Sequence, residues 1–325
     1  MKKKLFKKYY QNKGHSNSEI KKAISDVTKL ENQLNKEGKN LHTANISDIK
    51  KYVQTLINYK ENKETTLLAL ARYFYLIDAE DIYIYFTSIF GSKGVMENIK
   101  IRATRIVGED MTEEIFNNLS IPPLGTSNKK LFNYTKKVMG KMEENLEPEV
   151  CRKILTGNNH NIPKESFLKE KEFYKKAENL DDYLKNRHMR KVKELQQHSD
   201  QDKIWFEQKI NQDVVDYVDS NQEILSAVRE KDKLYTTKIP YDIVNFLDAN
   251  NKKMKQYFTC HCPFVRESFL SGEQINADWC YCSAGFVKFP YEIVFDTALD
   301  IELLESPLKG DPHCRFVIYL SEHLK

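Results

Sequence analysis

Cysteine is the residue type of this sequence best suited to chemistry, and five of the six cysteines fall within the last 66 residues. They form two C-x-C pairs, Cys260–Cys262 and Cys280–Cys282, followed by Cys314. Zinc takes four such ligands in a closed structural site, or three plus an open position in a catalytic site. Iron–sulfur clusters are held by the same thiolates. The pattern therefore predicts a metal site, with zinc favoured over an iron–sulfur cluster.

The backbone at each C-x-C pair decides whether both thiols can reach one ion. In a strand, residues i and i+2 point to the same side, which suits paired ligation. In a helix they diverge by about 200° and do not share an ion without distortion. The alternative is that these cysteines are small buried apolar residues, because free cysteine is among the most buried residue types. We expect that simpler role for Cys151, which stands alone in a helical segment.

A nucleophilic cysteine is the second interpretation of the cluster. It requires a base or a positive potential to populate the thiolate at neutral pH. Glu207, beside two aromatic residues, is either an acid or base lining a cavity or an outward-facing strand carboxylate. The histidines and arginines that could supply the base or the potential are His261, His313, Arg266, Arg315, His160 and His188.

The C-terminal segments also resemble known families. Cys282-Ser-Ala-Gly-Phe, Glu305 and Gly310-Asp-Pro-His-Cys-Arg-Phe resemble the 4-vinyl-reductase-type sensor domain. Cys262-Pro-Phe together with the same tail is similar to the L-2-amino-thiazoline-4-carboxylic acid hydrolase-like family. The resemblance covers roughly residues 200–325, and the chain as a whole also resembles a family without an assigned activity. The two named families share an α+β, often dimeric fold that encloses a small ligand, so a homodimer is expected here too.

The resemblance also implies a ligand set. In some aromatic-sensing members a zinc ion is held by a cysteine, by a glutamate about 23 residues later and by further cysteines. Cys282 and Glu305 have this separation, but Leu308 stands where the next cysteine would come. The candidate metal ligands are Cys260, Cys262, Cys280, Cys282, Cys314 and Glu305, and the candidate ligand-contacting side chains are Trp279, Phe286 and His261.

The 325 residues are enough for two domains, and the sequence offers one clear boundary. The stretch Ser120–Asn128 contains two adjacent prolines, which exclude a continuous helix, followed by turn-forming residues. Before it, apolar residues at helical spacing predict an all-helical domain over residues 16–120, with a helix break near Asp78. After it, residues 129–325 read as an α+β domain that carries the cysteines and the ligand site.

Roughly four antiparallel strands, with helices against one face, are predicted in the second domain. The expected strands are residues 203–210, 233–239, 300–305 and 314–320. The predicted fold class is therefore α+β, with a helical N-terminal domain followed by an antiparallel-sheet domain and its flanking helices.

Charge is distributed unevenly along the chain. Residues 1–60 hold 14 lysines against five acidic residues, whereas the remainder holds more acids than bases. Residues 1–15 are expected to be a basic arm, which in nucleic-acid-binding proteins contacts phosphates. No stretch approaches the roughly 18 apolar residues of a membrane span, and no apolar run follows the basic start as in a signal peptide. We therefore expect a cytoplasmic protein without membrane contact, and in that reducing compartment clustered thiols are rarely disulfides.

The leading hypothesis is a cytoplasmic, sensor-like protein that binds a small-molecule ligand beside a cysteine-ligated zinc. The first alternative is a hydrolase of small amides or cyclic imines that uses a cysteine or a zinc-bound water. The second is a nucleic-acid-binding regulator that uses the basic segment Lys2–Lys22.

Overall fold

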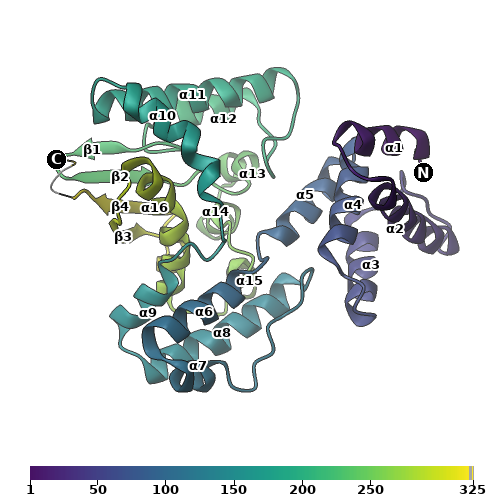
Figure 1. Ribbon diagram of the computed structural model, residues 1–325, viewed down its shortest axis with the longest axis horizontal. Coiled ribbons are helices and arrows are strands. Elements are labelled where there is room, and N and C mark those ends of the chain that lie inside the picture. Colours follow the sequence, from purple (N-terminus) through teal and green to yellow (C-terminus); the bar gives the residue numbers. More distant parts are fainter. Residues whose placement is uncertain (322–323, 325) are drawn as a thin grey trace. The chain divides into compact units, whose positions relative to one another are not determined.

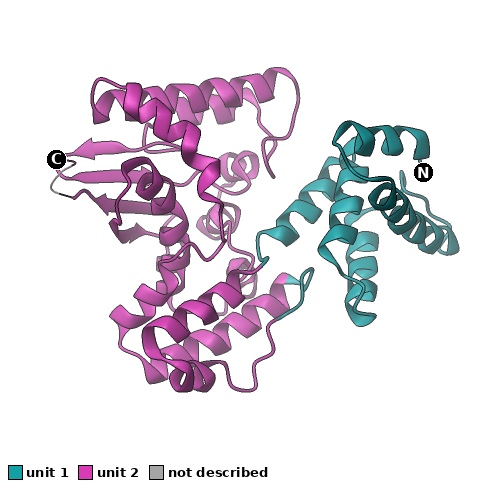
Figure 2. Cartoon of the chain, viewed as in Figure 1, with its two compact units in different colours: residues 1–93, 122–127 teal, residues 94–121, 128–325 magenta. Residues whose placement is uncertain are grey.

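The fold is α+β, as the sequence predicts. The computed structural model describes residues 1–321 and 324, and it shows helices throughout the N-terminal part and an antiparallel sheet in the C-terminal region (Figure 1). The chain divides into two compact units (Figure 2). Unit 1 comprises Met1–Lys93 and Pro122–Ser127, and unit 2 comprises Gly94–Ile121 and Asn128–Lys325.

Unit 1 is all-helical and is built around one apolar core. Along its second helix the buried residues follow the three- and four-residue spacing of an amphipathic helix, as in Ile20, Ala23 and Val27. The break expected near Asp78 is present, with Asp78 in the left-handed conformation between two helices. The helices are α1 (Lys3–Asn12), α2 (Asn17–Lys36), α3 (Ile46–Asn58), α4 (Glu64–Leu76) and α5 (Glu80–Phe90).

The first 15 residues differ from the expected basic arm. They contain α1, whose Phe6 and Tyr10 are buried at 0% and 4% exposure. The Phe6 ring packs edge-on against Tyr73 of α4, at 5.3 Å between ring centroids. The lysines of α1 lie on its exposed face, so the excess charge belongs to a folded helix rather than to a free arm.

The boundary between units also differs from the expected one. Residues 95–116, predicted to belong to the N-terminal domain, form α6 (Val95–Val107) and α7 (Glu109–Phe116), which pack on helices of unit 2. The proline-containing stretch does end the helical run, but Pro122–Ser127 returns to unit 1. There the carbonyl oxygen of Leu124 accepts a hydrogen bond from the Asn62 amide at 2.8 Å. The turn residues of this stretch therefore belong to a segment that returns to unit 1, and they do not mark the border between the two units.

Unit 2 continues with helices that lead to and then surround the sheet. They are α8 (Asn128–Asn145), α9 (Pro148–Leu155), α10 (Leu168–Lys176), α11 (Leu180–Asp200), α12 (Gln212–Asp219), α13 (Ile243–Asp248), α14 (Lys252–Thr259), α15 (Arg266–Ser271) and α16 (Tyr281–Phe295). Short 3-10 turns occur at η1 (Lys164–Phe167), η2 (Ala277–Cys280) and η3 (Pro307–Lys309). In the described part of the chain, no helix combines the length and the apolar character that a membrane crossing requires.

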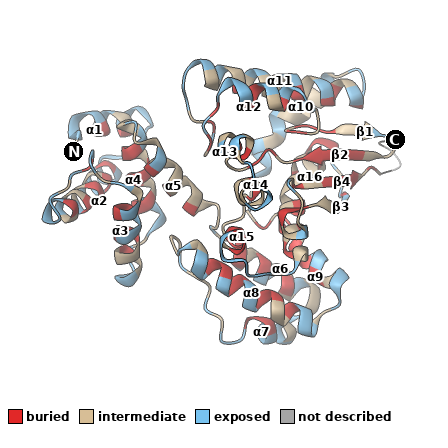
Figure 3. Ribbon diagram, turned by 180° about the vertical axis from the view of Figure 1, so that it is seen from behind, coloured by how far each residue is buried: buried red, intermediate tan, exposed pale blue. Residues whose placement is uncertain are grey.

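The sheet has four antiparallel strands in the order β1-β2-β4-β3. They are β1 (Val228–Glu230), β2 (Lys233–Thr237), β3 (Asp300–Glu305) and β4 (Arg315–Tyr319). Leu234 pairs with Ile318, and Phe316 pairs with Leu303, so these four buried apolar residues share one face of the sheet. The central strands β2 and β4 contain buried residues (Figure 3). Helices α16 and α11 contribute to the apolar core on that face.

One predicted strand is not a strand. Residues 203–210 form a tight turn in which Trp205 and Gln208 exchange backbone hydrogen bonds at 2.9 and 3.0 Å. Phe206, at the tip of this turn, has a φ of +53° and is 71% exposed. The apolar residues of this stretch gave the appearance of a strand, and the place of a fourth strand is taken by β1 instead.

Candidate functional site

Five cysteines from three distant chain segments meet in one apolar core of unit 2. Cys260 lies at the C-terminal end of α14 and Cys262 in the loop that follows, while Cys314 immediately precedes β4. Cys280 ends η2, and Cys282 lies in the first turn of α16. Cys260, Cys282 and Cys314 are 5%, 5% and 8% exposed, and all five are free thiols. The fold therefore brings the clustered cysteines of the sequence together in space.

Hydrogen bonds to backbone carbonyl groups hold these segments in place. The Thr259 hydroxyl donates to the Pro312 carbonyl at 2.7 Å, which joins the end of α14 to the loop before β4. The Lys238 amide donates to the Cys314 carbonyl at 2.9 Å and extends the pairing of β2 with β4. The Arg266 Nε donates to the Cys260 carbonyl at 2.7 Å. The cysteine positions are thus fixed by hydrogen bonds that do not involve the thiols.

The start of α16 is set by a close backbone approach. An ideal Cβ on Gly285 would lie 2.3 Å from the carbonyl oxygen of Gly157 and 2.6 Å from its nitrogen. Glycine at position 285 therefore lets the loop after α9 pack directly on α16, one turn beyond Cys282. This contact places Asn159 beside the Cys282 thiol, with 3.7 Å between its Nδ2 and the sulfur.

Four of the thiols form a mutually interacting group. Cys260, Cys262, Cys280 and Cys314 lie close enough that ionisation of one affects another in every pair. Burial raises the pKa of each thiol, to about 11 for Cys314, and the neighbouring sulfurs add to this for Cys260, Cys280 and Cys314. At neutral pH these groups are protonated thiols unless something positive binds them. We call these four residues the four-thiol group.

Cys282 stands beside this group. Burial raises its pKa to about 12, and its interaction with the other cysteines is through Cys262. Cys280 hydrogen-bonds Ser306, whereas Cys282 hydrogen-bonds Asn159. Cys280 and Cys282 lie at the beginning of a helix, and their side chains have different partners. The two thiols therefore diverge and do not share the strand-like geometry that would let both bind one ion.

Trp279, predicted to contact a ligand, contacts a thiol. Its indole Nε1 donates to the Cys262 sulfur at 3.3 Å, and its ring packs edge-on against Phe264. The side chain is only 1% exposed. Trp279 therefore supports the position and the partial charge of the Cys262 sulfur.

His261 and Phe286 lie on the border of the cluster. The His261 Nε2 lies 2.6 Å from the Ile239 carbonyl, so this nitrogen carries the proton and donates. Burial and the Lys238 ammonium lower the pKa of His261 well below its ordinary value, and the ring is neutral. Phe286 receives the Lys238 ammonium 5.0 Å from its ring centroid and meets the edge of His160. Burial likewise lowers the pKa of His160 to about 4.

Two cations face the thiols. The Lys238 Nζ donates to the Ser283 hydroxyl at 3.1 Å. Burial raises the pKa of Cys262, Cys282 and Cys314, and the Lys238 charge partly opposes that rise. Arg266 is 9% exposed and acts in the same direction on Cys260 and Cys262. Two positive charges therefore act on the four-thiol group.

Glu207 interacts with Arg266. Burial raises the pKa of this carboxyl group, and a hydrogen bond with Tyr241 partly opposes the shift. The Arg266 guanidinium stacks on the Tyr241 ring at 3.5 Å from its centroid. Glu207 is therefore not an outward-facing strand carboxylate, because it lies in the turn of residues 203–210 and interacts with Tyr241 and Arg266. Its role as an acid or base remains a hypothesis.

Glu305 lies at the other end of this region, opposite Arg315 in the sheet. Its charge acts on His313 and on Arg315, and Arg315 is also held by two hydrogen bonds to Glu223 at 2.7 and 2.8 Å. Cys282 instead faces Asn159. The Cys282–Glu305 pair implied by the sequence resemblance is thus not brought together by the contacts that each residue makes.

The remaining candidates have structural roles. His188 is 6% exposed, and its two ring nitrogens face the carbonyl groups of Ile224 and Asp219. The Cys151 sulfur lies 3.6 Å from the Met142 carbonyl in the core, as expected for an apolar cysteine. Within residues 1–321 and 324, no three or more His, Cys, Asp or Glu side chains stand ready-made around a metal position.

Sequence reasoning missed Lys238 and Asn159. Lys238 directly follows a strand, and its only signal was this position at the end of a predicted β-segment. Asn159 lies in Gly157-Asn-Asn-His-Asn, where the histidine drew attention instead. Neither residue is near the five clustered cysteines in the sequence, so their relation to these thiols comes from the fold alone.

Comparison with known proteins adds one match. Residues 243–325 match a family of unknown function (DUF6144). The matched segment begins at the first residue of α13 and includes all five clustered cysteines, but it excludes Lys238 and Asn159. No curated protein and no solved structure matches the chain.

Proposed function

We propose that unit 2 is a metal-stabilised ligand-binding domain, in which the four-thiol group binds one zinc ion. The observation that carries this proposal is the convergence of four thiols, from three segments, in one buried core. Zinc is bound tetrahedrally by four thiolates at about 2.3 Å in closed structural sites. An iron–sulfur cluster uses the same number of thiolates and is the alternative occupant.

The charges around the cluster support a bound anionic centre. A divalent ion with four thiolates carries a net charge of about −2, which is costly in an apolar core without compensation. Lys238 and Arg266 supply two positive charges that act on thiols of the group. The Trp279 indole donates a hydrogen bond to the Cys262 sulfur, as outer partners of metal-ligating sulfurs do.

Binding requires a local change at the thiols. The four-thiol group has raised pKa values, so the ion must displace protons as it binds. Cys262 and Cys314 lie in loops, which allows their sulfurs to close around an ion without moving a helix or a strand. Binding is therefore expected to weaken as the pH falls.

The metal would stabilise the domain and not react. A tetrathiolate site leaves no open position for a metal-bound water, which disfavours zinc-dependent hydrolysis. We place the small-ligand function at the adjoining surface of Lys238, Ser283, Phe286 and His160, which are half-buried residues next to the cluster.

Cobalt substitution tests the metal proposal directly. The full chain, purified under reducing conditions, is expected to bind one Co²⁺ with the strong visible and charge-transfer absorption of a tetrahedral thiolate site. Cys280→Ser is expected to abolish this spectrum. Cys282→Ser and Cys151→Ser are the matched controls and are expected to keep it. Zinc removal is expected to lower the melting temperature clearly, because structural zinc contributes on the order of 10 kcal/mol.

The results also discriminate the alternatives. A protein without metal by elemental analysis, whose unfolding is unchanged by chelators, would contradict the metal proposal. Loss of the cobalt spectrum in Cys282→Ser would mean that the assigned ligand set is wrong.

A second candidate function is hydrolysis of a small substrate with Cys282 as the nucleophile. The contact of Cys282 with the Asn159 amide and the nearby charge of Lys238 favour it. With zinc bound, selective alkylation of Cys282 by iodoacetamide at neutral pH would support it. A Cys282 thiol that stays unmodified at neutral pH would contradict it, because a cysteine nucleophile must be populated as the thiolate.

A further inference from the structure

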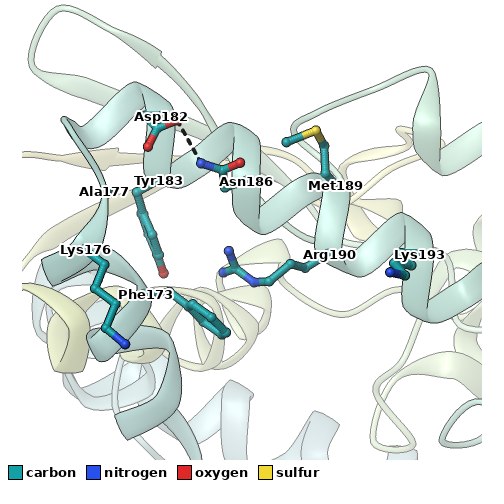
Figure 4. Close-up of a pocket in the computed structure, with 9 residues that line it drawn as sticks. All are labelled: Phe173, Lys176, Ala177, Asp182, Tyr183, Asn186, Met189, Arg190 and Lys193. Carbon is teal, nitrogen blue, oxygen red and sulfur yellow. Dashed lines mark hydrogen bonds between the residues drawn. The ribbon is translucent and has the colours of Figure 1, made fainter.

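A hollow of about 380 Å³ lies between α10 and α11 in unit 2, away from the thiols (Figure 4). Three of its lining side chains are cationic, namely Lys176, Arg190 and Lys193. Its one acidic residue, Asp182, already accepts a hydrogen bond from the Asn186 amide at 2.8 Å. The lining therefore has an excess of positive charge.

The carboxylate nearest to Arg190 is already shared. Glu170 accepts a hydrogen bond from Arg190 at 2.9 Å and from the Tyr183 hydroxyl at 3.3 Å. The Arg190 guanidinium also lies over the Phe173 ring, 3.9 Å from its centroid. Tyr183 and Phe173 both line the hollow, so this network forms part of its wall.

A second guanidinium belongs to the same network, although its residue, Arg187, is not among those that line the hollow. Arg187 is on α11, one turn from Tyr183, with which it hydrogen-bonds, and its charge interacts with Glu170. Its Nε and Nη1 are buried and have no hydrogen-bond partner in the described part of the chain. Its guanidinium also lies over the Tyr291 ring, 4.9 Å from the centroid. Two guanidiniums therefore share Glu170, and one of them keeps unpaired N–H groups in the interior.

Such an arrangement is costly unless something compensates it. A buried donor without a partner costs about 1–3 kcal/mol, and a buried unpaired charge costs more. A bound water would satisfy one N–H group but would not add negative charge, and the single Glu170 carboxylate is shared by the two guanidiniums of Arg187 and Arg190. An anion would satisfy both requirements, and an oxyanion offers several acceptor atoms to N–H groups.

We propose that the wall of this hollow binds a small oxyanion, a phosphate or carboxylate group, between Arg187 and Arg190. Lys176 and Lys193 attract the ligand to the opening, and Phe173 provides an apolar surface for the remainder of a larger ligand. The site is separate from the four-thiol group and does not depend on a bound metal.

Anion-dependent stability tests this proposal on the full chain. Melting temperatures are measured in inorganic phosphate and in acetate, against a bulky sulfonate at equal ionic strength. We expect a saturable rise with at least one of the two probes, of roughly 5 to 10 °C at a concentration about 100-fold above Kd. The probe that gives the larger rise identifies phosphate or carboxylate as the preferred group.

Variants locate the effect. Arg187→Gln is expected to remove the anion-dependent rise in melting temperature, whatever it does to the starting stability. Arg190 is partly exposed, and Arg190→Gln is expected to weaken anion binding at least tenfold. Arg229→Gln is the matched control, since Arg229 pairs with Asp181 on the exposed side of α11. An equal rise in all variants, or no rise in the parent protein with either probe, would overturn the proposal.

Discussion

Gly285→Ala tests the backbone contact that positions the cysteine-bearing start of α16. The added methyl group would lie 2.3 Å from the Gly157 carbonyl oxygen and 2.6 Å from its nitrogen, and both are backbone atoms. Overpacking of this kind costs about 1–3 kcal/mol, and contact with backbone places this case at the upper end. Replacing glycine by alanine inside a helix gains about 1 kcal/mol. We therefore expect a net destabilisation of about 2 kcal/mol.

Gly140→Ala is the matched control. Gly140 lies inside α8 of the same unit, and an added Cβ there would meet nothing within 4 Å. Only the helix propensity remains, so this variant is expected to be more stable by about 1 kcal/mol. Urea unfolding of both variants measures the difference, which should have opposite signs. Equal stabilisation by both substitutions would refute the close approach of α16 to the loop after α9.

Two further substitutions test charge and burial. Glu223→Gln should destabilise the sheet by about 1–2 kcal/mol at neutral pH, because Glu223 accepts two hydrogen bonds from the partly exposed Arg315. Burial alone would raise the pKa of Glu223, but its hydrogen bonds outweigh burial, so the pKa lies below its ordinary value of 4.5. Its stabilisation is thus present above that pH and is lost on acidification, so urea unfolding should show the two proteins converging below about pH 4.5; a constant difference would contradict this. Phe6→Ala should cost about 3–5 kcal/mol, whereas Leu5→Ala, at a 45% exposed position of the same helix, should change stability by about 0.5 kcal/mol or less. Similar effects of both on thermal unfolding would mean that α1 is not part of the core.

The sequence predicts much of the fold because many of its patterns are local. The strand at Asp300–Glu305 is correct to the residue, and the helix break at Asp78 is where a polar residue interrupts two apolar runs. The strand predicted at residues 203–210 is wrong because the apolar residues of this stretch lie in a tight turn. The unit boundary was missed because an amphipathic sequence predicts that α6 and α7 each bury one face, but it does not predict which other helices cover that face.

The candidate site could be located but not assembled from the sequence. Cysteine spacing identified the five thiols, and the structure places them in one core. The separation of Cys282 from the four-thiol group depends on a helix beginning at that pair, which spacing alone does not specify. Lys238 and Asn159 come from other parts of the chain, so their role follows from strand pairing and from the Gly285 contact.

The return of residues 122–127 to unit 1 has a consequence for synthesis. The chain passes between the units three times, after residues 93, 121 and 127. A fragment ending at residue 93 would therefore lack the carbonyl group that the Asn62 amide needs. On the ribosome, unit 1 cannot be completed until residue 127 has emerged, a delay of a few seconds at about 5–20 residues per second. During that time α6 and α7 are already made while most of unit 2 is not, so their apolar faces are available to chaperones.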